Sequence, residues 1–232
     1  IELPEIQTQM MRELKKAGKP LVYVNFSGSA IALEREAQLC DAILQAWYPG
    51  QAGGEAIASV LFGDYNPAGR LPVTFYKNTA QLPDFEEYSM KGRTYRYMTE
   101  EPLFPFGHGL SYSTFSYGEA RLSASKMQKG TTLSLIVPVS NTSQLDGEEV
   151  VQLYLCYPED KEGPVKALRA FKRVVIGKGA TQEVKFDLCE EDFEWFDPST
   201  NSIRPRSGEY EILYGGTSIA GGLKKVKVMC EF

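Results

Sequence analysis

The chain contains residue types used in nucleophilic catalysis, but they lack the spacing that this chemistry needs. Ser27-Gly-Ser-Ala follows an apolar, strand-like segment, as the nucleophile of many serine hydrolases does. The GxSxG pattern of those enzymes is absent, and a serine becomes nucleophilic only beside a general base. The single histidine, His108, lies in Phe-Pro-Phe-Gly-His-Gly, a segment typical of a packed turn. We therefore expect no Ser–His–Asp triad.

Carboxylates are abundant, and general acid–base or glycosidase chemistry needs two of them facing each other across a cleft. Asp64 precedes an Asn-Pro turn, where capping accounts for it. Glu55 lies in the first turn of a predicted helix, where a negative charge is favourable. The remaining candidates lie on a polar stretch expected to face solvent: Asp84, Glu86 and Glu87. No catalytic or substrate-binding residue is therefore assigned from residue type and spacing.

Metal, anion and glycan sites are also weakly supported. The four cysteines lack CxxC spacing, so we expect reduced, buried thiols rather than a zinc site; they are Cys40, Cys156, Cys189 and Cys230. The glycine-rich residues 50–54 precede a predicted helix and could bind an anion, but they match no nucleotide-binding motif, which favours a tight turn. Asn25-Phe-Ser and Asn141-Thr-Ser match the N-glycosylation pattern, and we expect neither to be used.

Residues 91–97 (KGRTYRY) interleave three cations with two aromatic rings, a pattern that could stack on sugars or nucleobases. We favour a structural interpretation, in which these cations pair with neighbouring carboxylates. Across 232 residues, 25 basic and 30 acidic side chains give a net charge of −5. That balance provides no general attraction for nucleic acid or an anionic membrane. The apolar runs, such as residues 21–24, are too short to span a bilayer.

The elements that would position these residues change in period along the chain. In residues 1–76, helix-like and strand-like segments alternate, which predicts a parallel sheet with helical crossovers. The predicted helices are residues 4–17, 32–39 and 55–62. The predicted strands are 21–26, which we expect to be covered on both faces, 42–47, which we expect to be buried, and 71–76. Ile6, Met10 and Leu14 form the expected buried stripe of the first helix. Three strands are too few for a complete doubly wound sheet, so we expect the C-terminal half of a larger α/β domain.

Residues 114–232 instead show a period of two, which predicts an antiparallel β-sandwich of about seven strands. The alternating runs are centred on Val137, Phe186, Ile212 and Val228, and Cys230 shares the apolar phase of the last run. Residues 77–113 lie between the two parts and contain six aromatic rings from Phe85 to Phe106. Because each such ring can bury a large area, we expect this segment to be an ordered connecting strap.

A long composite motif in the chain resembles that of a known protein family. Residues 47–76, WYPGQAGGEAIASVLFGDYNPAGRLPVTFY, closely resemble the C-terminal domain of glycoside hydrolase family 3. Residues 3–30 resemble an upstream segment of the same domain, and residues 102–115 resemble the family's connecting strap. Three further segments resemble the fibronectin type III-like (immunoglobulin-like) domain of the β-glucosidase and β-xylosidase branch: residues 147–157, 165–177 and 207–216.

The resemblance implies a retaining exo-acting glycosidase that removes terminal non-reducing β-D-glucosyl or β-D-xylosyl residues without a metal or organic cofactor. In the family an Asp on an N-terminal barrel is the nucleophile, and a Glu of the α/β domain is the acid/base. The resemblance places both before Ile1, so this chain is expected to be a C-terminal part that is inactive alone. Its expected partners are the missing barrel, a glycoside substrate reached through the full-length enzyme, and other copies of itself. A periplasmic or secreted location is expected from the same resemblance.

Two other functions stay open at this point. The sandwich loops or residues 93–97 could hold polysaccharide, which would make the chain a carbohydrate-binding or scaffolding module. Residues 50–54 could instead centre an anion- or nucleotide-binding site. The choice between glucoside and xyloside is also open, because the pocket that recognises the sugar lies mostly in the barrel.

Overall fold

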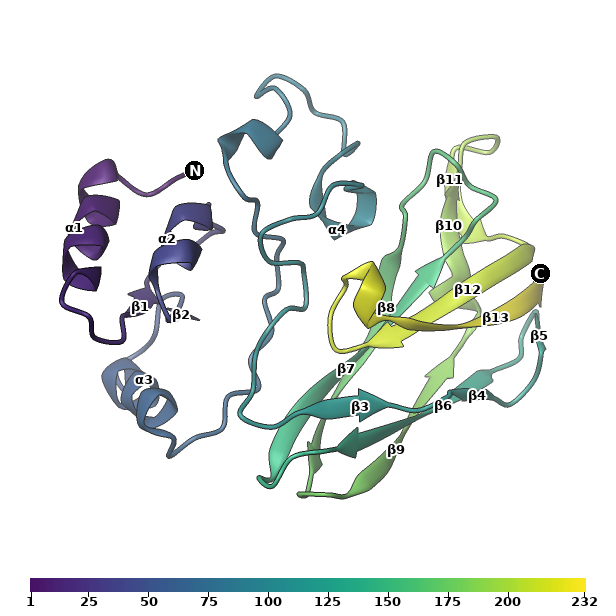
Figure 1. Ribbon diagram of the computed structural model, residues 1–232. Helices are drawn as coiled ribbons and strands as arrows, with labels where there is room; N and C mark the ends of the chain where they lie inside the picture. The colour runs from purple at the N-terminus through teal and green to yellow at the C-terminus, as the bar shows by residue number, and fades with distance from the viewer.

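A computed structural model describes all residues, 1–232. Figure 1 shows a small α/β unit at one end, a β-sandwich at the other and an irregular strap between them. The α/β unit contains a parallel pair of strands, in which Val22 lies opposite Ala42 and Asn25 opposite Gln45. The elements of this unit are α1 (Glu5–Lys15), β1 (Val22–Asn25), α2 (Glu34–Leu39), β2 (Ala42–Gln45) and α3 (Gly53–Phe62). The predicted fold class, an α/β part followed by an all-β sandwich, is confirmed.

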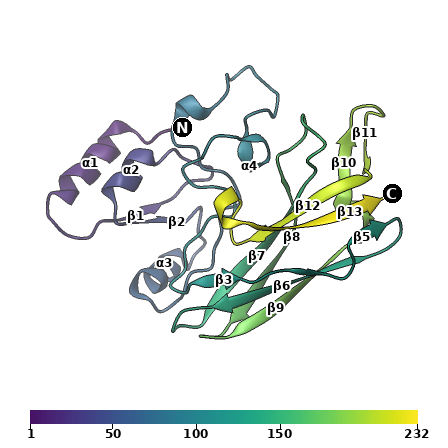
Figure 2. The same cartoon turned by 45° about the vertical axis from the view of Figure 1, so that its right-hand side comes forward.

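The α/β unit has a very small core. Helices α1 and α2 lie on one side of the strand pair and α3 on the other (Figures 1 and 2). Leu3, Met11 and Leu33 are its only clustered buried apolar residues. The strand predicted to be covered on both faces, residues 21–26, is only partly covered, since Val22 and Phe26 are exposed. No third strand pairs with β1 or β2, so both edges of the strand pair are open.

Helix α1 presents the opposite face from the one predicted. Ile6, Met10 and Leu14 are 70%, 56% and 51% exposed, although their spacing predicted a buried stripe. The buried residues of the helix are Thr8 and Met11. Thr8 donates a hydrogen bond to the carboxylate of Glu36 on α2, and this contact turns its face of the helix inward. The amphipathic pattern was real, but its apolar side has no partner within this chain.

The predicted third strand, residues 71–76, is wrong. This segment does not join β1 and β2; instead it forms one antiparallel bridge, between Phe75 and Phe104 of the strap. Leu71 donates its backbone N–H to His108 O at 2.8 Å, and Gly107 donates to Leu71 O at 2.8 Å. Pro72 has no N–H to donate, so a regular ladder is interrupted there. The strap therefore takes the hydrogen bonds that a neighbouring strand would have taken.

The sandwich consists of two packed sheets and a hairpin. One sheet has the order β5-β13-β12-β7-β8, and in the other β6 pairs with β3, β4 and β9. All pairs are antiparallel except β13 with β5. The strands are β3 (Phe115–Tyr117), β4 (Arg121–Leu122), β5 (Lys126–Gln128), β6 (Leu133–Asn141), β7 (Gly147–Cys156), β8 (Ala167–Ile176), β9 (Thr181–Leu188), β12 (Gly208–Gly215), β13 (Lys224–Glu231), with β10 (Glu194–Asp197) and β11 (Ser202–Pro205) as the hairpin. A 3₁₀ turn, η2 (Glu190–Phe193), precedes the hairpin, and another, η3 (Ala220–Gly222), lies between β12 and β13.

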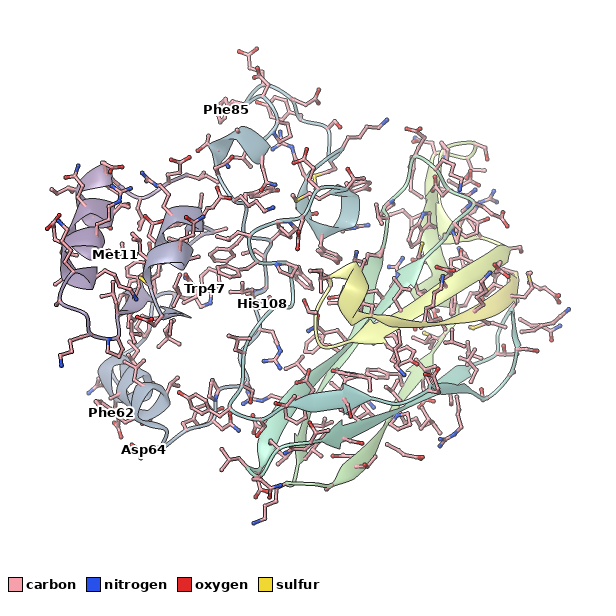
Figure 3. All side chains as sticks on the ribbon, in the orientation of Figure 1. Met11, Trp47, Phe62, Asp64, Phe85 and His108 are labelled. Carbon is pink, nitrogen blue, oxygen red and sulfur yellow. The ribbon has the colours of Figure 1, made fainter.

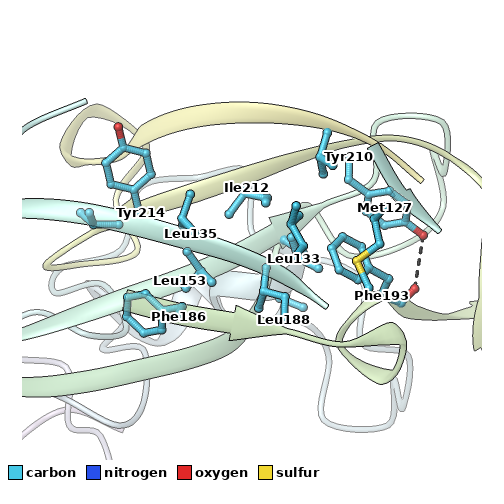
Figure 4. Close-up of a cluster of buried hydrophobic side chains, with 14 of the residues drawn as sticks. Met127, Leu133, Leu135, Leu153, Phe186, Leu188, Phe193, Tyr210, Ile212 and Tyr214 are labelled. Atoms are coloured by element: carbon cyan, nitrogen blue, oxygen red, sulfur yellow. Dashed lines mark hydrogen bonds between the residues drawn. The ribbon is translucent and has the colours of Figure 1, made fainter. Parts of the chain in front are cut away.

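The sandwich core follows the predicted alternation. Twenty-one buried residues form one cluster between the two sheets, part of which is drawn in Figure 4. Along β6, every second residue from Leu133 to Asn141 is buried, as a strand with one face on the core requires. Tyr210 buries its ring here and donates its hydroxyl to Phe193 O at 3.3 Å (Figure 4), which satisfies the polar end of the side chain. Cys230 is buried in the same cluster, as its phase predicted.

The strap contains two short helical turns, η1 (Thr79–Gln81) and α4 (Thr94–Tyr97), and otherwise irregular backbone. Tyr95 anchors it, because its ring stacks on Phe106 with centroids 4.4 Å apart and meets the edge of Tyr154 on β7. Phe85 and Tyr88 behave differently: they are 94% and 90% exposed. The prediction that all six rings pack down is therefore wrong for these two, because their loop projects away from both sheets (Figure 3).

Candidate functional site

The residues considered for nucleophilic catalysis lie in separate, self-contained environments. Ser27 is buried and donates its hydroxyl to Ser29 O at 2.8 Å, while it accepts from the amides of Asn25 and Gln45. His108 stacks on Phe104 with ring centroids 5.3 Å apart. Neither residue has a contact with the other. The structure therefore does not bring Ser27 and His108 together.

The buried carboxylates are also separate from one another. They are Glu36 on α2, Glu149 on β7 and Asp197 on β10, and each is held by its own partners. Asp197, for example, accepts from the guanidinium Nε of Arg204 at 2.8 Å and from the Ser199 hydroxyl. The carboxylates weighed from sequence are all exposed: Glu55, Asp64, Asp84, Glu86 and Glu87. None of the three buried carboxylates shares a hydrogen-bond partner with another.

The structure also locates the two glycosylation motifs, the glycine-rich segment and the segment that interleaves cations with rings. Asn25 and Asn141 are both buried and hydrogen-bonded, so neither is accessible as a glycan acceptor. Residues 50–54 form the tight turn into α3, which begins at Gly53. Lys91 pairs with Glu162 as expected, but the Arg93 guanidinium donates to backbone carbonyls instead of a carboxylate. The interpretation of residues 91–97 as structural therefore fits the geometry, with a different set of acceptors.

The cysteines are unpaired, and the expectation that all four are buried is wrong. Only Cys230 is buried, and Cys189 is exposed beside the acidic turn η2. Burial raises the pKa of the Cys230 thiol to about 12. Hydrogen bonding to Glu191 is the main cause that raises the pKa of Cys189 to about 11. No group of three or more His, Cys, Asp or Glu side chains is placed to hold a metal ion, and none of the helices is long and apolar enough to cross a membrane.

The best-organised polar cluster of the molecule joins the α/β unit to the sandwich. We call it the polar joint and define it as Asn66, Arg70, Tyr117, Glu149 and Gln152. Arg70 donates from its guanidinium to the Glu149 carboxylate at 2.7 Å, and only 10% and 4% of these two side chains are exposed. The other Glu149 oxygen accepts from the Tyr117 hydroxyl at 2.8 Å. The three groups come from the segment after α3, from β3 and from β7, so they tie three elements together.

Burial dominates the titration of this cluster. Desolvation raises the pKa of Glu149, and the nearby Arg70 charge opposes that rise. Desolvation also raises the pKa of the Tyr117 hydroxyl, followed in importance by the Glu149 charge. A buried ion pair of this kind gains strength from low dielectric but depends on both partners being present.

The amide side chains of the polar joint complete the connection. The Asn66 amide donates to Asp146 O at 2.9 Å and its carbonyl accepts from the backbone N–H of Tyr112 at 2.8 Å. The Gln152 amide donates to Gly107 O at 3.1 Å and Gly216 O at 2.7 Å. A β-carbon at Gly107 would lie 1.9 Å from the Gln152 amide oxygen, so only glycine allows this approach.

A row of aromatic rings makes the second connection. The rings of Trp47 and Phe75 are 6.1 Å apart, Phe75 and Phe104 are 6.3 Å apart, and Phe104 stacks on His108. Trp47 and His108, labelled in Figure 3, mark the two ends of the row. Trp47 has a φ of 54°, a conformation that bulky residues rarely adopt and that aims its ring at the strap. Burial is the main cause that lowers the pKa of His108, and the Arg70 charge adds to it.

Two clefts open beside the strap. One, of about 160 Å³, lies between the strap and the loop after β12, and Lys166, Glu100 and Ser218 are among its lining residues. The other, of about 250 Å³, is lined only by strap residues, including Gln81, Gly92 and Met98. In the first cleft no hydrogen bond joins Lys166 to Ser218. The polar joint and the aromatic row can hold one part of the chain rigidly against another.

Residues 1–112 match the sequence model of the glycosyl hydrolase family 3 C-terminal domain, and residues 149–218 match that of the fibronectin type III-like domain. The chain belongs to glycoside hydrolase family 3. It is 53% identical over 98% of its length to a xylan 1,4-beta-xylosidase of Xylanibacter ruminicola. It is 35% identical over 92% of its length to a periplasmic beta-glucosidase of Salmonella typhimurium. The chain spans only 26% and 32% of the lengths of these two family 3 relatives.

Solved structures of family 3 enzymes share the fold. A β-glucosidase from Erythrobacter marinus superposes with a TM-score of 0.86 at 37% identity, covering 99% of this chain and 30% of that enzyme. A beta-glucosidase from Listeria innocua, in complex with isofagomine, gives a TM-score of 0.85 at 30% identity, covering 99% of this chain and 34% of that enzyme. The joined α/β unit, strap and sandwich are thus an arrangement that known glycosidases contain.

The residues of the polar joint were not predicted to act together. Arg70 and Asn66 both lie in the motif that resembles the family, NPAGRLP, but no signal in the sequence connected them to Glu149, 79 positions after Arg70. Glu149 occupies a buried position in a strand whose buried residues are apolar apart from Glu149 itself and Gln152. A charged residue at such a position is the signal that predicts a buried partner.

Proposed function

We propose that this chain is the C-terminal part of a retaining exo-β-glycosidase that removes terminal non-reducing β-D-xylosyl or β-D-glucosyl residues. The observation that carries this proposal is the 53% identity, over 98% of the chain, to a xylan 1,4-beta-xylosidase. The same relative favours xylosides as the first substrates to test. Terminal glucosides stay in the proposal because the other relatives include beta-glucosidases.

We infer that the chain alone does not hydrolyse glycosides. Retaining hydrolysis needs two carboxyl groups about 5–5.5 Å apart on opposite sides of the anomeric carbon. In this chain the buried carboxylates are separated, and Glu149 is already engaged by Arg70 and Tyr117. The proposed contribution of the chain is structural: the polar joint holds the α/β unit against the sandwich, and the aromatic row holds it against the strap. The rest of the enzyme would then bind to a rigid surface.

The unpaired apolar surface of the α/β unit supports this role. The exposed stripe of α1 and the free edges of the strand pair are surfaces that a folded protein normally covers. We propose that the N-terminal portion of the enzyme covers them. Without that portion, the same surfaces are expected to cause self-association of the chain.

The test is the release of nitrophenol from aryl β-xylosides and aryl β-glucosides. Two proteins are compared: the 232-residue chain, and the polypeptide that also contains the N-terminal portion, here called the full-length enzyme. We expect hydrolysis by the full-length enzyme and none by the chain. Turnover by the purified chain would contradict its inactivity, and the absence of turnover by the full-length enzyme would contradict the assigned activity.

The competing function, a carbohydrate-binding module, is tested in parallel. A module that binds polysaccharide is retained by insoluble xylan or slowed in a native gel that contains soluble xylan. We expect the chain to migrate identically with and without xylan, with bovine serum albumin as the reference. Saturable retention of the chain would favour the binding module over the structural role.

A further inference from the structure

The loop of residues 83–93, which we call the projecting loop, exposes large apolar side chains at its outer end. Phe85 and Tyr88 are almost completely exposed, and Met90 is about half exposed. In Figure 3, Phe85 lies at the far end of this loop, away from both sheets. Two nearly bare rings three residues apart are unusual on a protein surface, where large apolar groups are normally covered by a binding partner.

The projecting loop is held in shape before anything binds to it. The Arg93 guanidinium donates from Nε to Ser89 O at 3.0 Å and also donates to the backbone carbonyl of Glu87. The side chains of Asp84 and Glu87 accept from backbone N–H groups two residues further along, which closes two local turns. Because these bonds fix the backbone, little conformational entropy remains to be lost when the rings bind. A preorganised loop with exposed rings is typical of a docking element.

The position of the N-terminus indicates what the projecting loop contacts. The Ile1 amino group donates to the Thr79 hydroxyl at 3.3 Å, and Thr79 in turn contacts the Glu2 carboxylate. Thr79 begins η1, which directly precedes the projecting loop, and Figures 1 and 2 both place the N-terminus beside this turn. Polypeptide that precedes Ile1 therefore emerges next to the loop. The family 3 relatives are three to four times as long as this chain, so such polypeptide would be large.

We propose that the projecting loop is a docking surface for the portion of the same enzyme that precedes Ile1, with Phe85 and Tyr88 as its two anchors. This inference rests on the proposed function, in which the chain is the C-terminal part of a longer glycosidase. The loop contacts its own sandwich mainly through the exposed ion pair between Lys91 and Glu162, so its outer face is free for this contact. The α/β unit and the projecting loop would then contact the N-terminal portion on two sides of Ile1.

The experiment is limited trypsin digestion, followed by mass spectrometry of the cleavage after Lys91, which lies in the projecting loop. In the chain alone the ordered loop should be cut at a slow, measurable rate, and in the full-length enzyme we expect this rate to be at least about tenfold lower, because docking buries the loop. The variants Phe85→Ala, Tyr88→Ala and their combination should return the cleavage rate of the full-length enzyme to that of the chain alone. Phe171→Ala, which truncates another exposed ring on β8, is the matched control and should leave the protection unchanged.

Other occupants give different results, and each would overturn the proposal. Equal cleavage in the chain and the full-length enzyme would mean that the loop faces solvent in both. Protection that appears only when xylobiose is added would indicate that the two rings bind a sugar. Protection that grows with protein concentration would indicate a second copy. Hydrolysis of aryl β-xyloside is measured on the same samples, so an inactive full-length enzyme would refute the proposed function while the digestion result remained interpretable.

Discussion

The sandwich and the α/β unit obtain their stability in different ways. The sandwich encloses twenty-one buried residues between two sheets, whereas the α/β unit has three buried apolar residues that cluster. In the sandwich, β6 alternates between buried and partly exposed positions along its whole length, and β9 alternates from Val184 onward. The α/β unit has comparable apolar residues on α1, but they face solvent. An apolar pattern therefore identifies the face of a helix or strand that packs against another surface. It does not say whether that surface belongs to the same chain.

The largest expected effect comes from separating the two regions at the polar joint. Arg70→Met leaves the buried Glu149 carboxylate without its ion-pair partner, which should cost about 3–5 kcal/mol of the free energy of unfolding. The two tryptophans report the regions separately, since Trp47 lies in the α/β unit and Trp195 in the sandwich. In urea titrations of Trp47→Phe and Trp195→Phe backgrounds, Arg70→Met should move the Trp47 transition to lower urea and split it from the other. Coincident transitions would contradict the proposed coupling.

A matched double variant sharpens that result. Adding Glu149→Leu to Arg70→Met removes the unpaired charge, so part of the lost stability should return. If the double variant is less stable than Arg70→Met alone, then the cost arises from lost packing and not from the buried carboxylate.

The second effect compares one leucine from each region. Leu135→Ala opens a cavity in the sandwich core and should cost about 2–5 kcal/mol. Leu14→Ala removes an exposed side chain from α1 and should change stability by less than about 0.5 kcal/mol. Both are measured by urea denaturation of the chain. A large cost for Leu14→Ala would mean that the stripe of α1 is covered in solution, for example by a second copy.

Thiol labelling should rank the local stability of the two regions. Cys40 packs at the small core of the α/β unit, and Cys230 lies in the sandwich core. With Cys156→Ser and Cys189→Ser in the background, a maleimide at neutral pH should label Cys40 about tenfold faster or more, because regions with few buried contacts open more often. The raised pKa of Cys230, about 12, acts in the same direction. Equal labelling rates would indicate that the whole chain opens as one unit.

The smallest expected effect is a pH dependence at the aromatic row. Burial lowers the pKa of His108, so its contribution to stability is present above the unfolded pKa of about 6.5 and is lost as the pH falls through the lower folded pKa. His108→Phe keeps a ring against Phe104 but cannot titrate. Between pH 7 and pH 5, the wild-type chain should lose more stability than this variant in urea titrations monitored at Trp47. Parallel pH profiles for the two proteins would contradict the assignment.

The same contrast explains which features the sequence could predict. The period of two located β6, β9, β12 and β13 with the correct faces, because the facing of a strand residue is set by its immediate neighbours. The period also gave the phase of Cys230 correctly. The burial of Ile6, Met10 and Leu14 was predicted wrongly, because their spacing does not say whether a partner surface is present. Residues 71–76 look like a strand, and yet the strap takes their hydrogen bonds.

The candidate site was harder to predict than the fold. The contact between Arg70 and Glu149 joins residues 79 positions apart, and it exists only after the α/β unit and the sandwich have docked. The exposure of Phe85 and Tyr88 also could not be predicted from the sequence. Aromatic residues in a loop predict burial on average, while the turns closed by Arg93 and Asp84 direct these two rings outward.

The position of β13 has a consequence for synthesis of the protein on the ribosome. This strand, Lys224–Glu231, is an interior strand of its sheet, flanked by β12 on one side and by β5 on the other. The β5 partner is made about one hundred residues earlier, so it has no β13 to pair with until Lys224–Glu231 has left the exit tunnel. A stop codon before Lys224 would leave both β5 and β12 without this partner. The two exposed strand edges would then favour aggregation or degradation of the product.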